Sequence, residues 1–181
     1  MASPIDTRDT GSKSGTPLEV RVTDDDSGTA ADTAVVLVTG NADVSKGHGW
    51  WLNQYRMKSP NDFTPAQLQC YLDIVGYLSL VFDQETDAST RAKATKVLNA
   101  PAKAPYDVIF DQHALGAWLN FANGSVKLDT PVDTTGDGVA DSTFGAAMFT
   151  AETVRTSPAS TSSQVKAQKN IVERIALQSA P

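Results

Sequence analysis

The chain has 181 residues, 40% of them hydrophobic, and a formal net charge of -6. This length is enough for one sizeable hydrophobic core, and the acidic balance excludes a nucleic-acid-binding surface built on basic residues. No apolar stretch reaches the roughly 20 residues of a membrane-spanning helix, so we expect neither a nucleic acid partner nor a membrane span. The single cysteine, Cys70, excludes a disulfide within the chain, and its apolar neighbours predict a buried, inert thiol.

Two segments precede the main domain. Residues 1–16 are rich in Ser, Thr, Gly and Asp, which predicts a disordered tail or linker. Residues 17–40 predict a β-hairpin, because Leu18, Val20 and Val22 alternate with polar residues and a valine-rich run follows an Asp-rich turn. An isolated hairpin is marginally stable in water, so we expect this one to pack on another part of the protein.

Residues 41–181 have helical periodicity and predict a helical domain. Thr64 with Gln67, and Thr161 with Gln164, form helix start signals. The predicted helices cover about residues 65–82, 89–98, 105–122, 142–154 and 162–175. Predicted inward-facing positions include Leu68, Val75, Val108, Trp118 and Val172. The predicted fold is therefore mainly α, a compact bundle of about five helices with an N-terminal β-hairpin and one Asp-rich loop.

The segment DTTGDGVADSTF, residues 133–144, places oxygen-bearing groups at alternate positions. Calcium is a hard cation that takes about six to eight oxygen ligands, which a loop supplies at alternate residues. Gly138 stands at position 6 of the segment, where such a loop must turn sharply. The pattern predicts a Ca²⁺ site whose ligands, at positions 1, 3, 5, 7 and 9, are Asp133, Thr135, Asp137, the Val139 carbonyl and Asp141.

This segment resembles the calcium loop of EF-hand and dockerin proteins. It departs from that loop at Thr135, which is neutral, and at Phe144, where the resemblance implies an acid. We expect Asp129 to supply the missing carboxylate, and without it an affinity on the order of 10⁻⁴ to 10⁻³ M. Since Asp and Gly are also good turn formers, a loop without a metal ion is the alternative.

A second resemblance concerns the hairpin. The segment VRVTDDDSGTAADTAVVLVT, residues 20–39, resembles the last two strands of PKD-type domains, which are immunoglobulin-like sandwiches of secreted and cell-surface proteins. The helical remainder, with GHGWWLNQY and ALGAWLNFANG, is similar to uncharacterised C-terminal regions of large secreted bacterial proteins. These resemblances imply a location outside the cell and neighbouring domains in a longer chain.

Three other groups of side chains carry possible chemistry. We expect Trp50 and Trp51 to lie in a loop, where they could stack on sugar rings together with Tyr55. The favoured interpretation is that one of the two tryptophans anchors the loop to the core.

Asp107 and Asp111 share a helix face and could act as acid and base. A solvated helix face is the more common role of such a pair.

The only two histidines, His48 and His113, are too few for a zinc site of four protein ligands.

The sequence therefore favours a non-catalytic, calcium-stabilised structural or interaction module of a secreted or cell-surface bacterial protein. Its expected partners are the neighbouring domains of a longer chain, and a glycan or another surface protein. A carbohydrate-binding module using the exposed tryptophans is the alternative. A hydrolase is the weakest hypothesis, because the chain has no nucleophile elbow, phosphate-binding glycine loop or His-Glu-x-x-His motif.

Overall fold

The computed structural model of the protein consists of two compact units, one from Met1 to Val38 and one from Thr39 to Pro181. It describes residues 16–23, 29–36, 39–40, 42, 44–58, 60–82 and 88–178. The predicted tail at residues 1–16 lies outside these ranges except for Thr16.

The first unit contains the predicted β-hairpin. Strands β1 (Thr16–Thr23) and β2 (Thr29–Val36) pair antiparallel, from Thr16 opposite Val36 to Thr23 opposite Thr29. Threonine and valine are frequent in both strands, as their stiff, branched side chains favour extended backbone. The Asp-rich connection between the strands lies outside the described residues.

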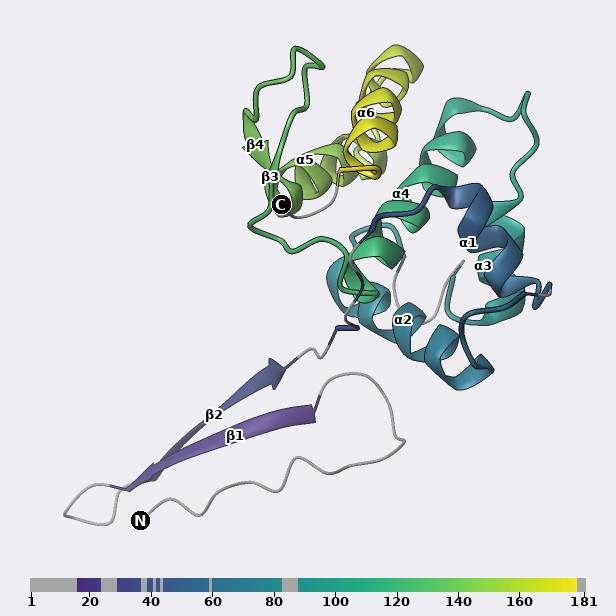
Figure 1. Ribbon diagram of the computed structural model, residues 1–181. Helices are drawn as coiled ribbons and strands as arrows, with labels where there is room; N and C mark the ends of the chain where they lie inside the picture. Colours follow the sequence, from purple (N-terminus) through teal and green to yellow (C-terminus); the bar gives the residue numbers. More distant parts are fainter. Residues whose placement is uncertain are drawn as a thin grey trace. The chain divides into compact units, whose positions relative to one another are not determined.

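The second unit is a helical domain, in agreement with the predicted mainly α fold (Figure 1). All five other helices contact the central helix α4, and α5 also packs against α6. In the described residues the six helices are α1 (His48–Tyr55), α2 (Pro65–Leu78), α3 (Arg91–Leu98), α4 (Tyr106–Ala122), α5 (Phe144–Thr156) and α6 (Ser162–Ile175).

Helix α4 forms the centre of the core because its second half is apolar on every side. All residues from Ala114 to Ala122 are buried, and the Trp118 ring is completely enclosed. A helix that is hydrophobic around its whole circumference needs neighbours on every side. Asn123 caps its C-terminal end, and Gly124 follows in the left-handed conformation (φ 85°), which glycine favours after a helix end.

The start signals of α2 and α6 form the predicted capping boxes. The Thr64 hydroxyl accepts a hydrogen bond from the Gln67 backbone N–H, and the Gln67 side chain accepts one from the Thr64 backbone N–H. Thr161 and Gln164 repeat this arrangement at α6. Each box satisfies backbone donors that the first turn of a helix otherwise leaves without a partner.

Four details of the predicted helical domain need correction. Helix α1 forms where we expected a loop, so the described residues contain six helices where about five were predicted. Helix α2 ends at Leu78, whereas the predicted helix continues to Phe82. Cys70 is exposed on α2 instead of buried. Val108 lies in the first turn of α4 and is 37% exposed, because this turn extends beyond the core that encloses the second half of the helix.

Candidate functional site

The Asp-rich segment forms a closed turn whose two ends pair with each other. Strands β3 (Pro131–Val132) and β4 (Ser142–Thr143) run antiparallel at its base, and the Asp141 N–H donates to the Val132 carbonyl at 3.0 Å. We call residues 133–141 the aspartate turn. Helix α5 begins directly after β4, and the Thr143 side chain caps its first turn. The turn therefore joins a short ladder to the start of a core helix.

The Asp133 carboxylate organises the interior of the turn. It accepts hydrogen bonds from the backbone N–H groups of Gly136 at 2.5 Å and Gly138 at 2.8 Å, and from the Thr135 hydroxyl at 3.2 Å. Both glycines adopt the left-handed conformation, with φ of 88° and 87°, which residues with a Cβ rarely adopt. These bonds lower the pKa of Asp133, because they stabilise its ionised form.

The other two aspartates of the turn also accept hydrogen bonds from its backbone. Asp141 accepts from the N–H and the hydroxyl of Thr134 at 3.0 and 2.9 Å, and Asp137 accepts from the Val139 N–H at 2.8 Å. The bond from the Thr134 N–H lowers the pKa of Asp141, whereas the nearby Asp133 charge acts to raise it. The hydrogen bonds outweigh this repulsion, because the net effect on the pKa of Asp141 is a decrease.

Two side chains at the C-terminal end of the domain attach the aspartate turn to α6. The Gln178 amide accepts from the Asp133 N–H at 2.9 Å and donates to the Asp133 carbonyl at 3.0 Å. The Arg174 guanidinium donates to the Thr134 carbonyl. It also lies over Gly136, where a Cβ would come within 3.0 Å of the guanidinium carbon. The turn is therefore fixed to the last helix as well as to its own ladder.

The donor chemistry of the aspartate turn fits a calcium ion. The predicted set consists only of hard oxygen atoms, from three carboxylates, one hydroxyl and one carbonyl, which suit Ca²⁺. In the part of the chain that the structure describes, no three His, Cys, Asp or Glu side chains converge as a metal-binding group. Asp129, the expected additional ligand, lies in an exposed turn before β3. Binding therefore requires the carboxylates to exchange some loop hydrogen bonds for the ion.

The aromatic residues proposed for glycan binding lie on α1 and mostly face the core. Trp51 is 0% exposed and Tyr55 3%. The Trp51 indole N–H donates to the Asn120 side-chain oxygen at 3.0 Å, and the Tyr55 hydroxyl donates to the Leu68 carbonyl at 2.8 Å. Trp50 is partly exposed, makes an edge contact with Trp51 and lies under the Lys46 ammonium group. Trp51 therefore anchors α1 to the core, and the three rings do not form an exposed platform.

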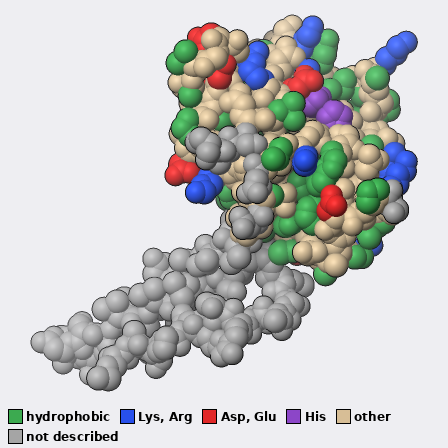
Figure 2. Space-filling model, viewed as in Figure 1, with side chains coloured by type: hydrophobic (Ala, Val, Ile, Leu, Met, Phe, Trp, Pro, Cys, Tyr) green, Lys and Arg blue, Asp and Glu red, His purple; other side chains and the backbone are tan. Residues whose placement is uncertain are grey.

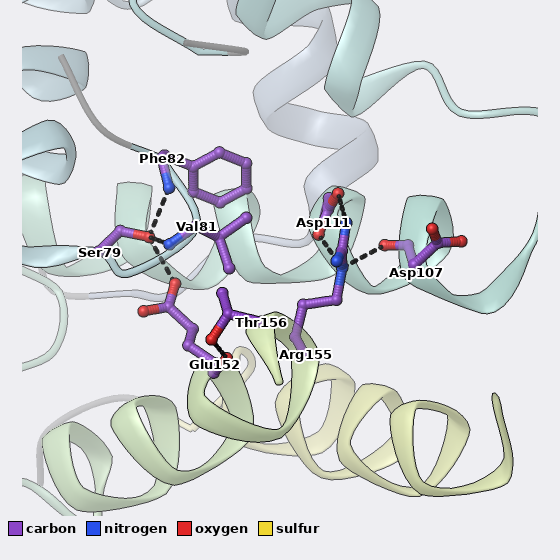
Figure 3. Close-up of polar contacts among 8 residues, drawn as sticks. All are labelled: Ser79, Val81, Phe82, Asp107, Asp111, Glu152, Arg155 and Thr156. Atoms are coloured by element: carbon purple, nitrogen blue, oxygen red, sulfur yellow. Dashed lines mark hydrogen bonds and ion pairs between the residues drawn. The ribbon is translucent and has the colours of Figure 1, made fainter. Parts of the chain in front are cut away.

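A buried carboxylate that the sequence analysis missed lies between α5 and the end of α2 (Figure 3). Glu152 is 0% exposed and accepts hydrogen bonds from the Ser79 hydroxyl at 2.5 Å, the Leu80 N–H at 2.8 Å and the Trp118 indole N–H at 2.8 Å. Burial raises the pKa of Glu152, and these hydrogen bonds act in the opposite direction. Glu152 follows Phe144 and Met148 at intervals of four, so its position on the apolar face of α5 was a readable signal.

The carboxylate pair proposed as acid and base is divided by Arg155. Asp111 forms a two-point ion pair with the Arg155 guanidinium, with both N–O distances 2.9 Å, whereas Asp107 contributes only its backbone carbonyl (Figure 3). A groove of about 810 Å³ lies beside this ion pair. It is lined by Asp107, Arg155, the segment before α4 and the α5–α6 connection, but not by Asp111. The geometry does not present two carboxylates to one ligand.

The two histidines meet at the surface of the helical domain, although 65 positions separate them in the sequence. The imidazole rings of His48 on α1 and His113 on α4 lie edge to face with their centroids 4.6 Å apart. Both rings are partly exposed, and Figure 2 shows them side by side. The sequence does not predict this pairing, because only tertiary packing brings the two histidines together.

Comparison with known proteins gives no relative for this chain. No protein-family model matches it, and neither a curated protein nor a solved structure matches it. The longest described helix, α4, has 17 residues, and none of the described helices has the length and hydropathy of a membrane span.

Proposed function

We propose that this chain is a non-catalytic module, stabilised by calcium, from a secreted or cell-surface bacterial protein. The observation that carries the proposal is the closure of the aspartate turn: the Gly138 N–H donates to the Asp133 carboxylate at 2.8 Å. This bond folds the segment so that positions 1 and 6 lie together, and the alternate oxygen-bearing residues belong to that one short turn.

Calcium would add an attraction to the ionised carboxylates of the turn. Asp133, Asp137 and Asp141 put three acidic side chains within nine residues, and the Asp133 charge acts against the ionisation of Asp141. A bound cation turns this repulsion into attraction. Extracellular calcium concentrations suit a weak site of this type.

The attachment of the turn explains how the ion would act on the whole module. Gln178 and Arg174 connect the turn to α6, and the ladder connects it to α5. An ion that binds only the folded turn therefore stabilises both helices, since ligand binding to the native state adds to the free energy of unfolding. Such a module would serve as a structural or interaction domain beside the neighbouring domains of a longer chain.

The described side chains do not favour the other two hypotheses. Two of the three aromatic rings proposed for a glycan are buried. Asp111 of the carboxylate pair is bound by Arg155.

Thermal unfolding with calcium and with a chelator tests the proposal. We expect calcium to raise the midpoint by several degrees, and Asp137→Ala to abolish this shift while leaving the fold intact. Asp107→Asn removes the same charge outside the turn and is the matched control, which should keep the shift. Equal midpoints with calcium and with chelator in the unaltered protein would overturn the proposal.

A parallel measurement with Asp129→Asn tests the expected additional ligand. If Asp129 moves to the ion, this variant weakens calcium binding; if water completes the shell, its affinity equals that of the unaltered protein.

A further inference from the structure

The histidine pair is held in place by a rigid part of the core. The Asn120 side chain bonds both the N–H and the carbonyl of Lys46, which fixes the chain two residues before α1. Gly116, one turn after His113 on α4, lets the backbone of His48 approach, since a Cβ there would lie 3.1 Å from the His48 Cα. The two rings therefore meet through fixed backbone rather than through a chance contact of flexible side chains.

The ring nitrogens are free to bind a ligand. Within the ranges that the structure describes, the imidazoles of His48 and His113 form no hydrogen bond with another residue, and their contact is with each other. Both rings are partly exposed at the same surface position (Figure 2). An imidazole without a hydrogen bond at the surface keeps a nitrogen lone pair that an ion can reach.

The electrostatic environment keeps the rings neutral and adds an acid beside them. Burial lowers the pKa of both histidines, and for His113 the neighbouring His48 lowers it further, to about 4. Glu173 on α6 lies within electrostatic reach of both rings and is bound to Lys169 at 2.7 Å. Neutral imidazole is the form that coordinates metal ions.

We propose that His48 and His113 together bind one borderline transition-metal ion, such as Zn²⁺ or Ni²⁺, through one nitrogen of each ring. Imidazole suits these ions, whereas calcium requires oxygen ligands, so this site is chemically separate from the aspartate turn. No third His, Cys, Asp or Glu of the described residues joins the pair in a metal-binding group. The ion therefore keeps water in its remaining positions, and the site is open to an additional ligand.

Calorimetric titration of the full chain with ZnCl₂ and with NiCl₂, at pH 7.5 and in excess CaCl₂, tests this proposal. We expect one ion per chain. His48→Ala and His113→Ala should each weaken binding by about tenfold or more, because each removes one of two nitrogen ligands. Asp107→Asn removes an acidic charge outside both sites and is the control, which should bind these ions like the unaltered protein. This result does not depend on whether the turn binds calcium.

Nuclear magnetic resonance of the unaltered protein gives a second readout that needs no variant to fold. Addition of Zn²⁺ should shift the ring nitrogen signals of both histidines together, in proportion to occupancy. Absence of binding, a shift of one histidine alone, or unchanged affinity in either histidine variant would each overturn the proposal.

Discussion

The Trp118 indole N–H donates a 2.8 Å hydrogen bond to the Glu152 carboxylate, and both side chains are completely buried. The same carboxylate also accepts from the Ser79 hydroxyl and the Leu80 N–H. One acidic group therefore satisfies donors from two other segments, the core helix α4 and the chain that leaves α2. The helical domain uses Glu152 as an internal connector.

Removal of this connector should destabilise the domain strongly. Glu152→Ala leaves the buried Trp118 indole N–H and the partly buried Leu80 N–H without this acceptor and creates a cavity, so we expect a loss of about 4 kcal/mol. Glu152→Gln keeps one acceptor oxygen and should cost less, about 1–2 kcal/mol. Denaturant unfolding measures both, with exposed Thr150→Ala on the same helix as a control that stays within about 0.5 kcal/mol. Equal stability of the Ala and Gln variants would contradict this role.

Substitution of Asn120 should also destabilise the domain strongly, because the side-chain amide of Asn120 uses its full hydrogen-bonding capacity. Its oxygen accepts from the Lys46 N–H and the Trp51 indole, and its nitrogen donates to the Lys46 and Ala176 carbonyls. Asn120→Asp keeps the shape but turns a carboxylate toward two carbonyl oxygens, and we expect it to lose about 3 kcal/mol or more. Unfolding of this variant at pH 7 checks the prediction, and wild-type stability there would refute it.

The two glycines of the aspartate turn offer a matched comparison. Both have φ near +88°, so an alanine at either position should cost about 1–2 kcal/mol in backbone strain. At Gly136 the new methyl group would also meet the Arg174 guanidinium at 3.0 Å, whereas at Gly138 it would meet open space. We therefore expect Gly136→Ala to be less stable than Gly138→Ala in calcium-free buffer. Equal stability of the two variants would show that Arg174 moves aside without cost, and the reverse order would contradict the prediction.

The histidine pair should make stability depend on pH. In the folded state the pKa of His113 is lowered from 6.5 to about 4, mainly by burial and then by the neighbouring His48. Glu173 opposes this decrease, and Lys169 adds to it. The unfolded chain then binds more protons, so stability falls as pH decreases from about 6.5 to about 4 and is constant below that. We expect a loss of about 2 kcal/mol after solvent screening.

Denaturant unfolding between pH 4 and pH 8 measures this effect, and His113→Gln should flatten the curve. Glu152 has a raised pKa and contributes the opposite slope, since its contribution to stability is lost as pH rises. The difference between the unaltered protein and the histidine variant removes the Glu152 contribution. A difference that does not change with pH would contradict the prediction.

Local signals made most of the helical domain predictable. The capping boxes at Thr64 and Thr161 fix the starts of α2 and α6, and each depends on residues only three positions apart. Helix α1 escaped prediction because it has eight residues, no side-chain cap and glycines at its start. Its position depends on the distant Asn120 side chain.

The wrong prediction of burial for Cys70 and the missed tertiary contacts also arise because burial and packing depend on distant residues. Cys70 has apolar neighbours, but it lies two positions after Leu68, which places it on the opposite side of α2 from the buried face. The residues of the aspartate turn could be listed from their spacing, whereas its attachment to α6 could not. Similarly, nothing in the sequence pairs His48 with His113, because the contact depends on how α1 packs on α4.

The bonds from Gln178 to Asp133 place part of the support of the aspartate turn beyond the last helix. Gln178 lies beyond the last residue of α6, Ile175, in a stretch that a trimmed version of the protein would readily omit. Ending the chain after Ile175 would keep the residues of every described helix and the Arg174 contact, and yet remove both Gln178 bonds to the acidic segment far upstream. The structural contacts of the helical domain therefore extend past its last helix.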